Sequence, residues 1–132
     1  MTSDPAENAE QFRAVCQQIH EKHGRRSRSP EASLNRMVQK YFGDHHGHVP
    51  RPPELTPENT CVARETRSKL EFAKMAFDLH TGQQPSGDSG HSIIIARYGG
   101  ADYLFDGNKR CRYWHKHGDT GPHEAYVLIV RA

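Results

Sequence analysis

The segment between residues 92 and 105 constrains the fold of this chain more than any other. Residues 92–98 are rich in β-branched side chains, Gly99 and Gly100 follow, and residues 101–105 are a second run with strand composition. Two glycines between two such runs are typical of a tight β-hairpin, because the turns that suit twisted strands require positive φ angles. The sequence therefore predicts an antiparallel strand pair here.

A helix and a closing strand are predicted after the hairpin. Residues 108–117 have helical composition and are followed by Gly118, a common helix stop. Residues 124–131 are apolar and β-branched, which is typical of a buried strand. The three predicted strands would form a small sheet.

Two N-terminal helices are predicted from their start signals. Residues 4–7 and 29–31 each combine a capping side chain with a proline and a glutamate, and Gly24 and Gly43 would end the two helices. The first helix has one narrow apolar stripe, so we expect it to dock loosely or against a partner. The second has a broader stripe that would face the core, formed by Leu34, Met37, Val38, Tyr41 and Phe42.

A third helix is predicted over residues 63–80, which are rich in good helix formers and are followed by a stop at Gly82. The triplet Thr56-Pro57-Glu58 resembles a helix start, and residues 44–57 predict an irregular connection with three histidines and four prolines. We therefore expect an α/β chain of the α+β kind. Residues 1–55 would be a helical segment and residues 56–132 a sheet-containing domain, packed as one compact unit.

The composition of the chain argues against a dedicated nucleic-acid-binding domain and against a membrane-spanning protein. The hydrophobic fraction of 34% is low for a globular chain, and 18 lysines and arginines nearly balance 16 aspartates and glutamates. The chain thus lacks the strong positive charge of a dedicated nucleic-acid-binding domain. No apolar run approaches the length of a membrane span, and the three cysteines form no C-x-x-C pair. We expect a cytoplasmic protein with reduced thiols and no membrane contact.

The turn Asp106-Gly107-Asn108-Lys109-Arg110 is the candidate functional site. A strand that runs directly into a helix leaves the first N–H groups of that helix unpaired, and these groups favour an anion. Gly107 lets a ligand approach the backbone, and Lys109 and Arg110 can donate charge-assisted hydrogen bonds. Because cations at a helix N-terminus oppose the helix dipole, their placement predicts a bound anion that compensates for them. The structural alternative is that Asp106 caps the helix while both cations are solvated.

Residues 93–130, with a hairpin, a D-G-x-x-R turn, a helix and a return strand, resemble the ParB/sulfiredoxin superfamily. The resemblance rests on Asp106, Gly107 and Arg110 and covers about the last third of the chain. Members bind nucleotide phosphates at this turn, and they include plasmid-partition CTPases, sulfiredoxins, free-serine kinases and plasmid fertility-inhibition proteins with ATPase and nuclease activity.

The resemblance implies a nucleotide ligand, ATP or CTP with Mg²⁺, and an NTPase, phosphotransferase or nuclease activity in plasmid or DNA regulation. Asp106 and Arg110 would be the catalytic residues, with Asp106 orienting the turn or a metal-bound water and Arg110 neutralising developing charge. The nucleotide-binding residues would be Gly107, Asn108, Lys109 and Arg110.

Departures from the family pattern exclude some of its activities. Sulfiredoxins carry their reactive cysteine where this chain has Asn108, and Cys111 is not an equivalent position. The chain stops at Ala132 with no helix-turn-helix segment after the fold, so a centromere-binding protein is not expected. Glu65 and Glu71 are candidates for the catalytic glutamate of the serine kinases, without a clear match to it.

The same turn also resembles the core of the Fic motif of AMP-transferring enzymes. However, Asp102 stands where that motif has its histidine base, and Leu104 stands where it has phenylalanine. The motif also joins two helices, whereas a hairpin leads into it here. A degenerate Fic domain would bind a phosphate as well.

Two clusters contain side chains that can ligate a metal ion, and neither has a recognised ligand spacing. They are Asp44 with His45, His46 and His48, and Cys111 with His115, His117 and His123. We predict no metal site. The loop histidines should be solvated, and Cys111 and Trp114 should lie in the core.

A rival functional class is a non-catalytic regulatory module that binds DNA or a partner protein. The arginines at 25, 26 and 28 are expected to be a solvated linker.

Overall fold

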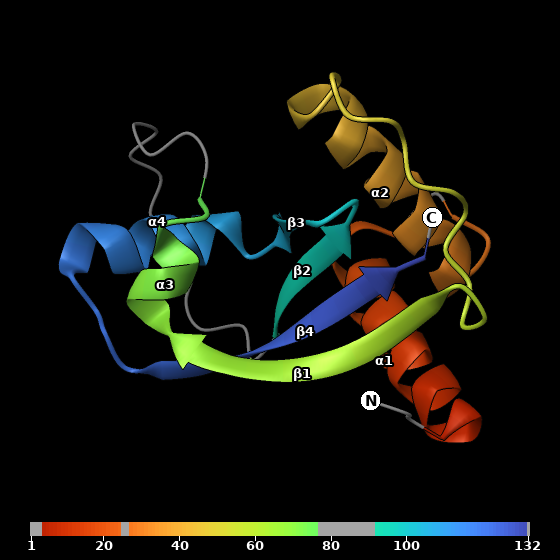
Figure 1. Cartoon of the computed structure of the whole chain (residues 1–132), viewed down its shortest axis with the longest axis horizontal. Helices are drawn as coiled ribbons and strands as arrows, with labels where there is room; N and C mark the ends of the chain where they lie inside the picture. The colour runs from red at the N-terminus through yellow and green to blue at the C-terminus, as the bar shows by residue number, and fades with distance from the viewer. Residues whose placement is uncertain (1–3, 25–26, 77–91, 132) are drawn as a thin grey trace.

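The computed structural model describes residues 4–24, 27–76 and 92–131. Within these ranges the chain has four helices and a four-stranded mixed sheet, which confirms an α+β fold (Figure 1). In chain order the elements are α1 (Pro5–His23), α2 (Pro30–His45), β1 (Thr60–Ser68), α3 (Lys69–Ala73), β2 (Ile93–Tyr98), β3 (Ala101–Asp106), α4 (Asn108–His117) and β4 (Pro122–Val130).

The sheet has the strand order β1-β4-β2-β3. Strands β2 and β3 form the predicted antiparallel hairpin, in which Gly99 and Gly100 have φ angles of 59° and 81°. Helix α4 then connects β3 to β4, which lies parallel to β2, and β1 pairs antiparallel with β4. The two apolar strands are therefore central, and the more polar β1 and β3 are the edges.

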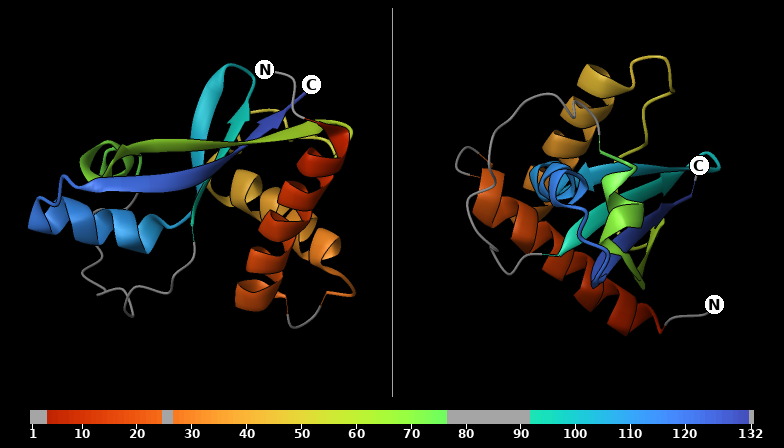
Figure 2. Two further views of the ribbon diagram at one scale, coloured as in Figure 1. Left: turned by 90° about the horizontal axis from the view of Figure 1, so that it is seen from below. Right: turned by 90° about the vertical axis from the view of Figure 1, so that its left-hand side faces the viewer.

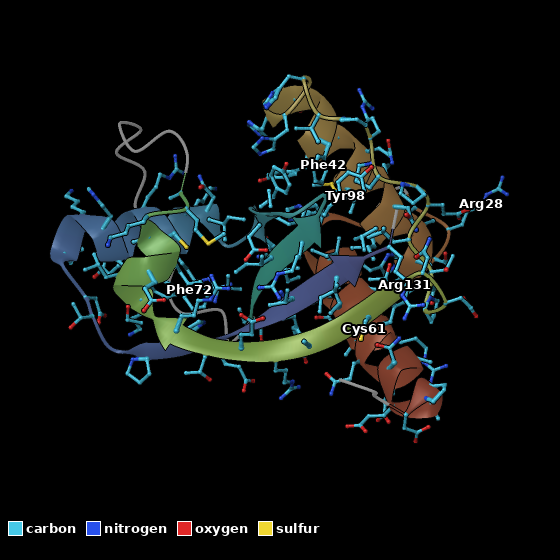
Figure 3. All side chains as sticks on the ribbon, in the orientation of Figure 1. Arg28, Phe42, Cys61, Phe72, Tyr98 and Arg131 are labelled. Atoms are coloured by element: carbon cyan, nitrogen blue, oxygen red, sulfur yellow. The ribbon has the colours of Figure 1, made fainter. Side chains whose placement is uncertain are left out.

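Helices cover both faces of the sheet, with α1 and α2 at one end and α3 and α4 at the other (Figures 1 and 2). Ile94 belongs to the core shared with α1 and α2, whereas Ile93 and Ile95 belong to the core beneath α3 and α4. Phe42 and Phe72 mark these two cores in Figure 3. Because successive strand residues point to opposite faces, the isoleucine run in β2 is buried on both sides.

Helix α1 docks tightly, so the expectation of loose docking is wrong. Its apolar stripe is at most 1% exposed and shares one core with α2 and the sheet: Phe12, Val15, Cys16 and Ile19. The Asn8 side chain donates to the carbonyls of Pro57 and Thr60 and accepts from the Val62 N–H. This buried amide connects α1 to the start of β1. The spacing of apolar residues in the sequence does not predict this contact.

The predicted helix over residues 63–80 is also wrong across its first third, because residues 60–68 form strand β1. All nine residues of β1 pair with β4, and Arg64 bonds to Glu124 and Tyr126 across that pair. Pairing along a complete neighbouring strand outweighs the weak helix propensity of these residues. Among the described residues of this segment the helical part is α3, and residues 77–80 lie outside the described residues.

Two helix boundaries also differ from the prediction. Thr56 and Asn59 exchange hydrogen bonds between side chain and backbone, which makes residues 56–60 a closed turn and not a helix start. Helix α2 continues past Gly43 to His45. Gly43 instead admits the Arg51 side chain, since a Cβ at this position would lie 2.6 Å from Nη2 of Arg51.

The tight docking of α1 can be tested with Phe12→Ala. Removing this fully buried ring should lower the free energy of unfolding by about 3–5 kcal/mol, measured by urea denaturation. The exposed neighbour Arg13→Ala is the control and should change it by less than about 0.5 kcal/mol. A loss below about 1 kcal/mol for Phe12→Ala would instead support loose docking.

Candidate functional site

The turn between β3 and α4 forms where the sequence predicts it. Asp106 is the last residue of β3, and Gly107 is the N-cap of α4 with a φ angle of 108°. A Cβ at Gly107 would lie 2.2 Å from Cδ1 of Ile93. Only glycine therefore fits both the backbone conformation and the close packing of the turn on β2.

The N-terminus of α4 differs from those of the other three described helices. Helices α1, α2 and α3 each have a side-chain cap, from Asp4, Ser29 and Ser68, and an acidic residue in the first turn. Helix α4 has neither a side-chain cap from its N-cap residue nor an acidic residue in its first turn. The positive end of its dipole faces Lys109 and Arg110 instead, an arrangement that a bound anion would stabilise.

Asp106 points to α1 and does not cap α4, so the structural alternative for this residue is wrong. Nζ of Lys22 lies 3.1 Å from Oδ1 and 3.0 Å from Oδ2 of Asp106. Nε2 of Gln18 donates to Oδ2 at 3.2 Å. These contacts leave the carboxylate side chain 11% exposed and join the turn to the last turns of α1.

Ser92 connects α1 with α4 at the start of β2. Gln18 donates to the Ser92 carbonyl at 2.8 Å and accepts from the Ser92 N–H at 3.1 Å. Nη2 of Arg110 donates to the same carbonyl at 3.2 Å. This guanidinium nitrogen would be 3.5 Å from a Cβ at Gly107, so Arg110 folds back over the turn.

The structure thus brings four of the predicted residues together on the α4 side: Gly107, Asn108, Lys109 and Arg110. Lys109 is exposed and Asn108 is half-buried. Sequence reasoning missed Gln18, Lys22 and Ser92, which complete the surroundings of Asp106. A glutamine at a buried position of an apolar helix stripe is the one signal that could have pointed to this contact.

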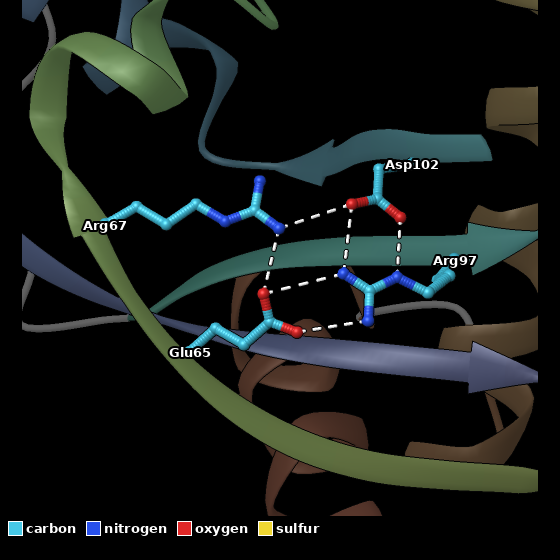
Figure 4. Close-up of polar contacts among 4 residues, drawn as sticks. All are labelled: Glu65, Arg67, Arg97 and Asp102. Carbon is cyan, nitrogen blue, oxygen red and sulfur yellow. Dashed lines mark hydrogen bonds and ion pairs between the residues drawn. The ribbon is translucent and has the colours of Figure 1, made fainter.

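A second polar constellation lies on the face of the sheet that carries α3 and α4. Glu65 and Arg67 of β1, Arg97 of β2 and Asp102 of β3 form a ring in which arginines and carboxylates alternate (Figure 4). Arg67 lies 2.8 Å from Glu65 and 3.3 Å from Asp102, and Arg97 lies 3.1 Å and 2.8 Å from the same two carboxylates. The ring connects the two edge strands across the central pair.

The carboxylates of this ring are poor candidates for acid–base chemistry. Hydrogen bonds from Arg67 lower the pKa of Glu65, and those from Arg97 lower the pKa of Asp102. Both groups are therefore ionised at neutral pH and are occupied by arginines. Glu65, a candidate for a kinase-like glutamate, and Asp102, which stands at the Fic histidine position, both belong to the ring and not to the turn.

Cys111 is buried, and the histidines of the described residues belong to no metal-binding group. Cys111 and Trp114 lie in the core under α4, as predicted, and burial raises the pKa of the Cys111 thiol to about 12. That thiol is therefore protonated and unreactive at neutral pH. Among residues 4–24, 27–76 and 92–131, no three side chains of His, Cys, Asp or Glu are arranged to hold a metal ion.

Comparisons with protein-family models, with curated proteins and with solved structures find no match to this chain. The resemblance to the ParB/sulfiredoxin superfamily therefore rests on the motif alone. In the part of the chain that the structure describes, no helix has the length and apolar character needed to cross a membrane.

Gly107→Ala tests the packing of the turn. The added methyl group meets Ile93 and the positive φ strains an alanine, so the free energy of unfolding should fall by about 2–4 kcal/mol. Gly118→Ala is the control, because Gly118 also has a positive φ but open space around it. If both variants lose the same stability in urea denaturation, the contact with Ile93 has no energetic role.

The charged ring should make stability depend on pH in the acid range. Because the native pKa values of Glu65 and Asp102 are lowered, the ring stabilises the fold above their ordinary values of 4.5 and 3.8. This contribution is lost as the pH falls through the native values, at about 1 kcal/mol or less for each group. The measurement is the free energy of unfolding as a function of pH. In Glu65→Gln this free energy should decrease less steeply as the pH falls through the acid range, whereas Glu124→Gln should behave as the wild type does.

Proposed function

We propose that this chain binds the phosphate groups of a nucleotide, ATP or CTP with Mg²⁺, at the turn of residues 106–110. The observation that carries the proposal is the N-terminus of α4, where the N-cap residue Gly107 provides no side-chain cap and the first turn holds Lys109 and Arg110 with no acidic residue. A phosphate at this position would accept hydrogen bonds from N–H groups of the first turn and offset the positive end of the dipole.

Each residue of the turn has a role in this proposal. Gly107 and Asn108 offer backbone donors, and Lys109 and Arg110 neutralise charge that develops as a phosphate is hydrolysed or transferred. Two roles were open for Asp106: to orient the turn, or to position a metal-bound water. Its contacts to Lys22 and Gln18 favour the first role. Mg²⁺ would arrive with the nucleotide and shield its phosphates.

The superfamily resemblance supports the same proposal. The hairpin, the turn, α4 and β4 follow one another in the order that the resemblance implies. A cytoplasmic NTPase, phosphotransferase or nuclease in plasmid or DNA regulation is the corresponding biological role. We propose that the chain belongs to this superfamily because it carries the D-G-x-x-R motif at residues 106–110.

A second candidate is a non-catalytic module that binds the DNA backbone or a partner protein. The observation that favours it is the composition of α4, which carries Lys109, Arg110, Arg112 and Lys116 and no acidic residue. Such a helix can contact a phosphodiester backbone without any turnover. This module would bind DNA with a steep salt dependence and would not distinguish nucleotides.

Calorimetric titration of the wild type and of Arg110→Ala with ATP, CTP and ADP, each with Mg²⁺, tests the first candidate. Loss of one charge-assisted contact should cost about 1.5–3 kcal/mol of binding free energy, and any turnover should be lost with it. Lys116→Ala removes a cation from the other end of α4 and should bind normally. Failure of the folded wild type to bind all three nucleotides would contradict the proposal.

A further inference from the structure

Lys22 and Arg110 stand at the two ends of a continuous chain of hydrogen bonds. Arg110 donates to the Ser92 carbonyl, Gln18 donates to that carbonyl and to Asp106, and Asp106 accepts from Lys22. The chain crosses from the first turn of α4 to the last turn of α1. A cation of α1 is thereby held beside the proposed phosphate site.

Lys22 is held by the Asp106 carboxylate and is still partly open to solvent. Its side chain is 25% exposed, whereas that of Asp106 is 11% exposed. Further cations lie nearby on α2. Burial is the main cause of the lowered pKa of His23. The charge of Asp106 acts in the opposite direction and raises this pKa, whereas the charges of Lys22, Arg36 and Lys40 lower it. This end of α1 is thus a positive region in which Asp106 is an embedded negative charge.

We infer that Lys22 is a third phosphate-binding cation and that Asp106 is an internal anion that competes with the ligand for it. The inference rests on the proposed phosphate site at the turn and adds a regulating element to that site. A phosphate on the N-terminus of α4 would draw the Lys22 ammonium toward itself and away from Asp106. The binding free energy is then reduced by the energy needed to loosen the resting ion pair.

This competition predicts that a substitution of Asp106 increases the affinity of the site for an anion. Asp106→Asn releases Lys22 and should tighten the binding of an inorganic anion, whereas an Asp106 that binds the ligand or its metal predicts weaker binding. The probe is pyrophosphate without Mg²⁺, so that no metal can bridge Asp106 and the ligand. We expect affinity to rise about three- to tenfold in Asp106→Asn and to fall by a similar factor in Lys22→Gln.

A double-mutant cycle separates the release of Lys22 from a general loss of negative charge. If Asp106 acts by restraining Lys22, the gain from Asp106→Asn should shrink to less than about twofold in the Lys22→Gln background. A gain of equal size in both backgrounds would overturn the inference. So would unchanged or weaker binding by Asp106→Asn when the wild type binds pyrophosphate.

A matched control is available at the other end of α4. Lys69 and Asp119 form an ion pair at 3.1 Å, in which the lysine is as exposed as Lys22 and the carboxylate is more exposed than Asp106. Asp119→Asn removes the same charge from the same kind of pair, and it should leave pyrophosphate affinity unchanged. A gain in Asp119→Asn equal to that in Asp106→Asn would show that net charge alone is responsible, which contradicts the inference.

A measurement on the wild type avoids dependence on the folding of any variant. During a pyrophosphate titration, the NMR resonances of the Lys22 ε-methylene group should shift with saturation, while those of Lys69 stay constant. A saturated site with unmoved Lys22 resonances would overturn the inference while leaving the proposed function intact. Absence of binding by both the wild type and Asp106→Asn would instead reject the phosphate site itself.

Discussion

The burial of β2 on both faces is the constraint on which the rest of the structure depends. Ile94 joins the core under α1 and α2, and Ile93 and Ile95 join the core under α3 and α4. A strand with two apolar faces must be covered twice, so the small sheet needs helices on each side. The N-terminal helices are therefore part of the core, and α1 contributes to it with a fully buried stripe.

The candidate site lies where these two helical layers meet. Gly107 packs on Ile93 at the start of β2, and the turn leads directly into α4. On the other side, Asp106 and Ser92 are bonded to Gln18 of α1. The geometry of the turn consequently depends on α1, although the motif that identifies it lies entirely in the last third of the chain. A phosphate site here would be shared between two layers.

The charged ring performs a different task from the turn. Its two carboxylates are held ionised by arginines, and its contacts run from β1 across the central strands to β3. Helices cover this face of the sheet only in part. In the ring, each charged side chain has partners of opposite charge. Strand β3 is one edge of the sheet and ends in the candidate turn. The ring thus connects β3 to β1, the strand at the opposite edge.

The sequence by itself determined the features that arise from local chemistry. The two glycines of the hairpin, the capping residues of α1 and α2, and the bounds of α4 all follow from backbone conformation within a few residues. Only the tertiary structure decided that residues 60–68 form a strand and that Asp106 bonds to Lys22. The reason is physical, because strand pairing and ion pairing depend on partners about sixty to eighty residues away, which local propensity does not encode.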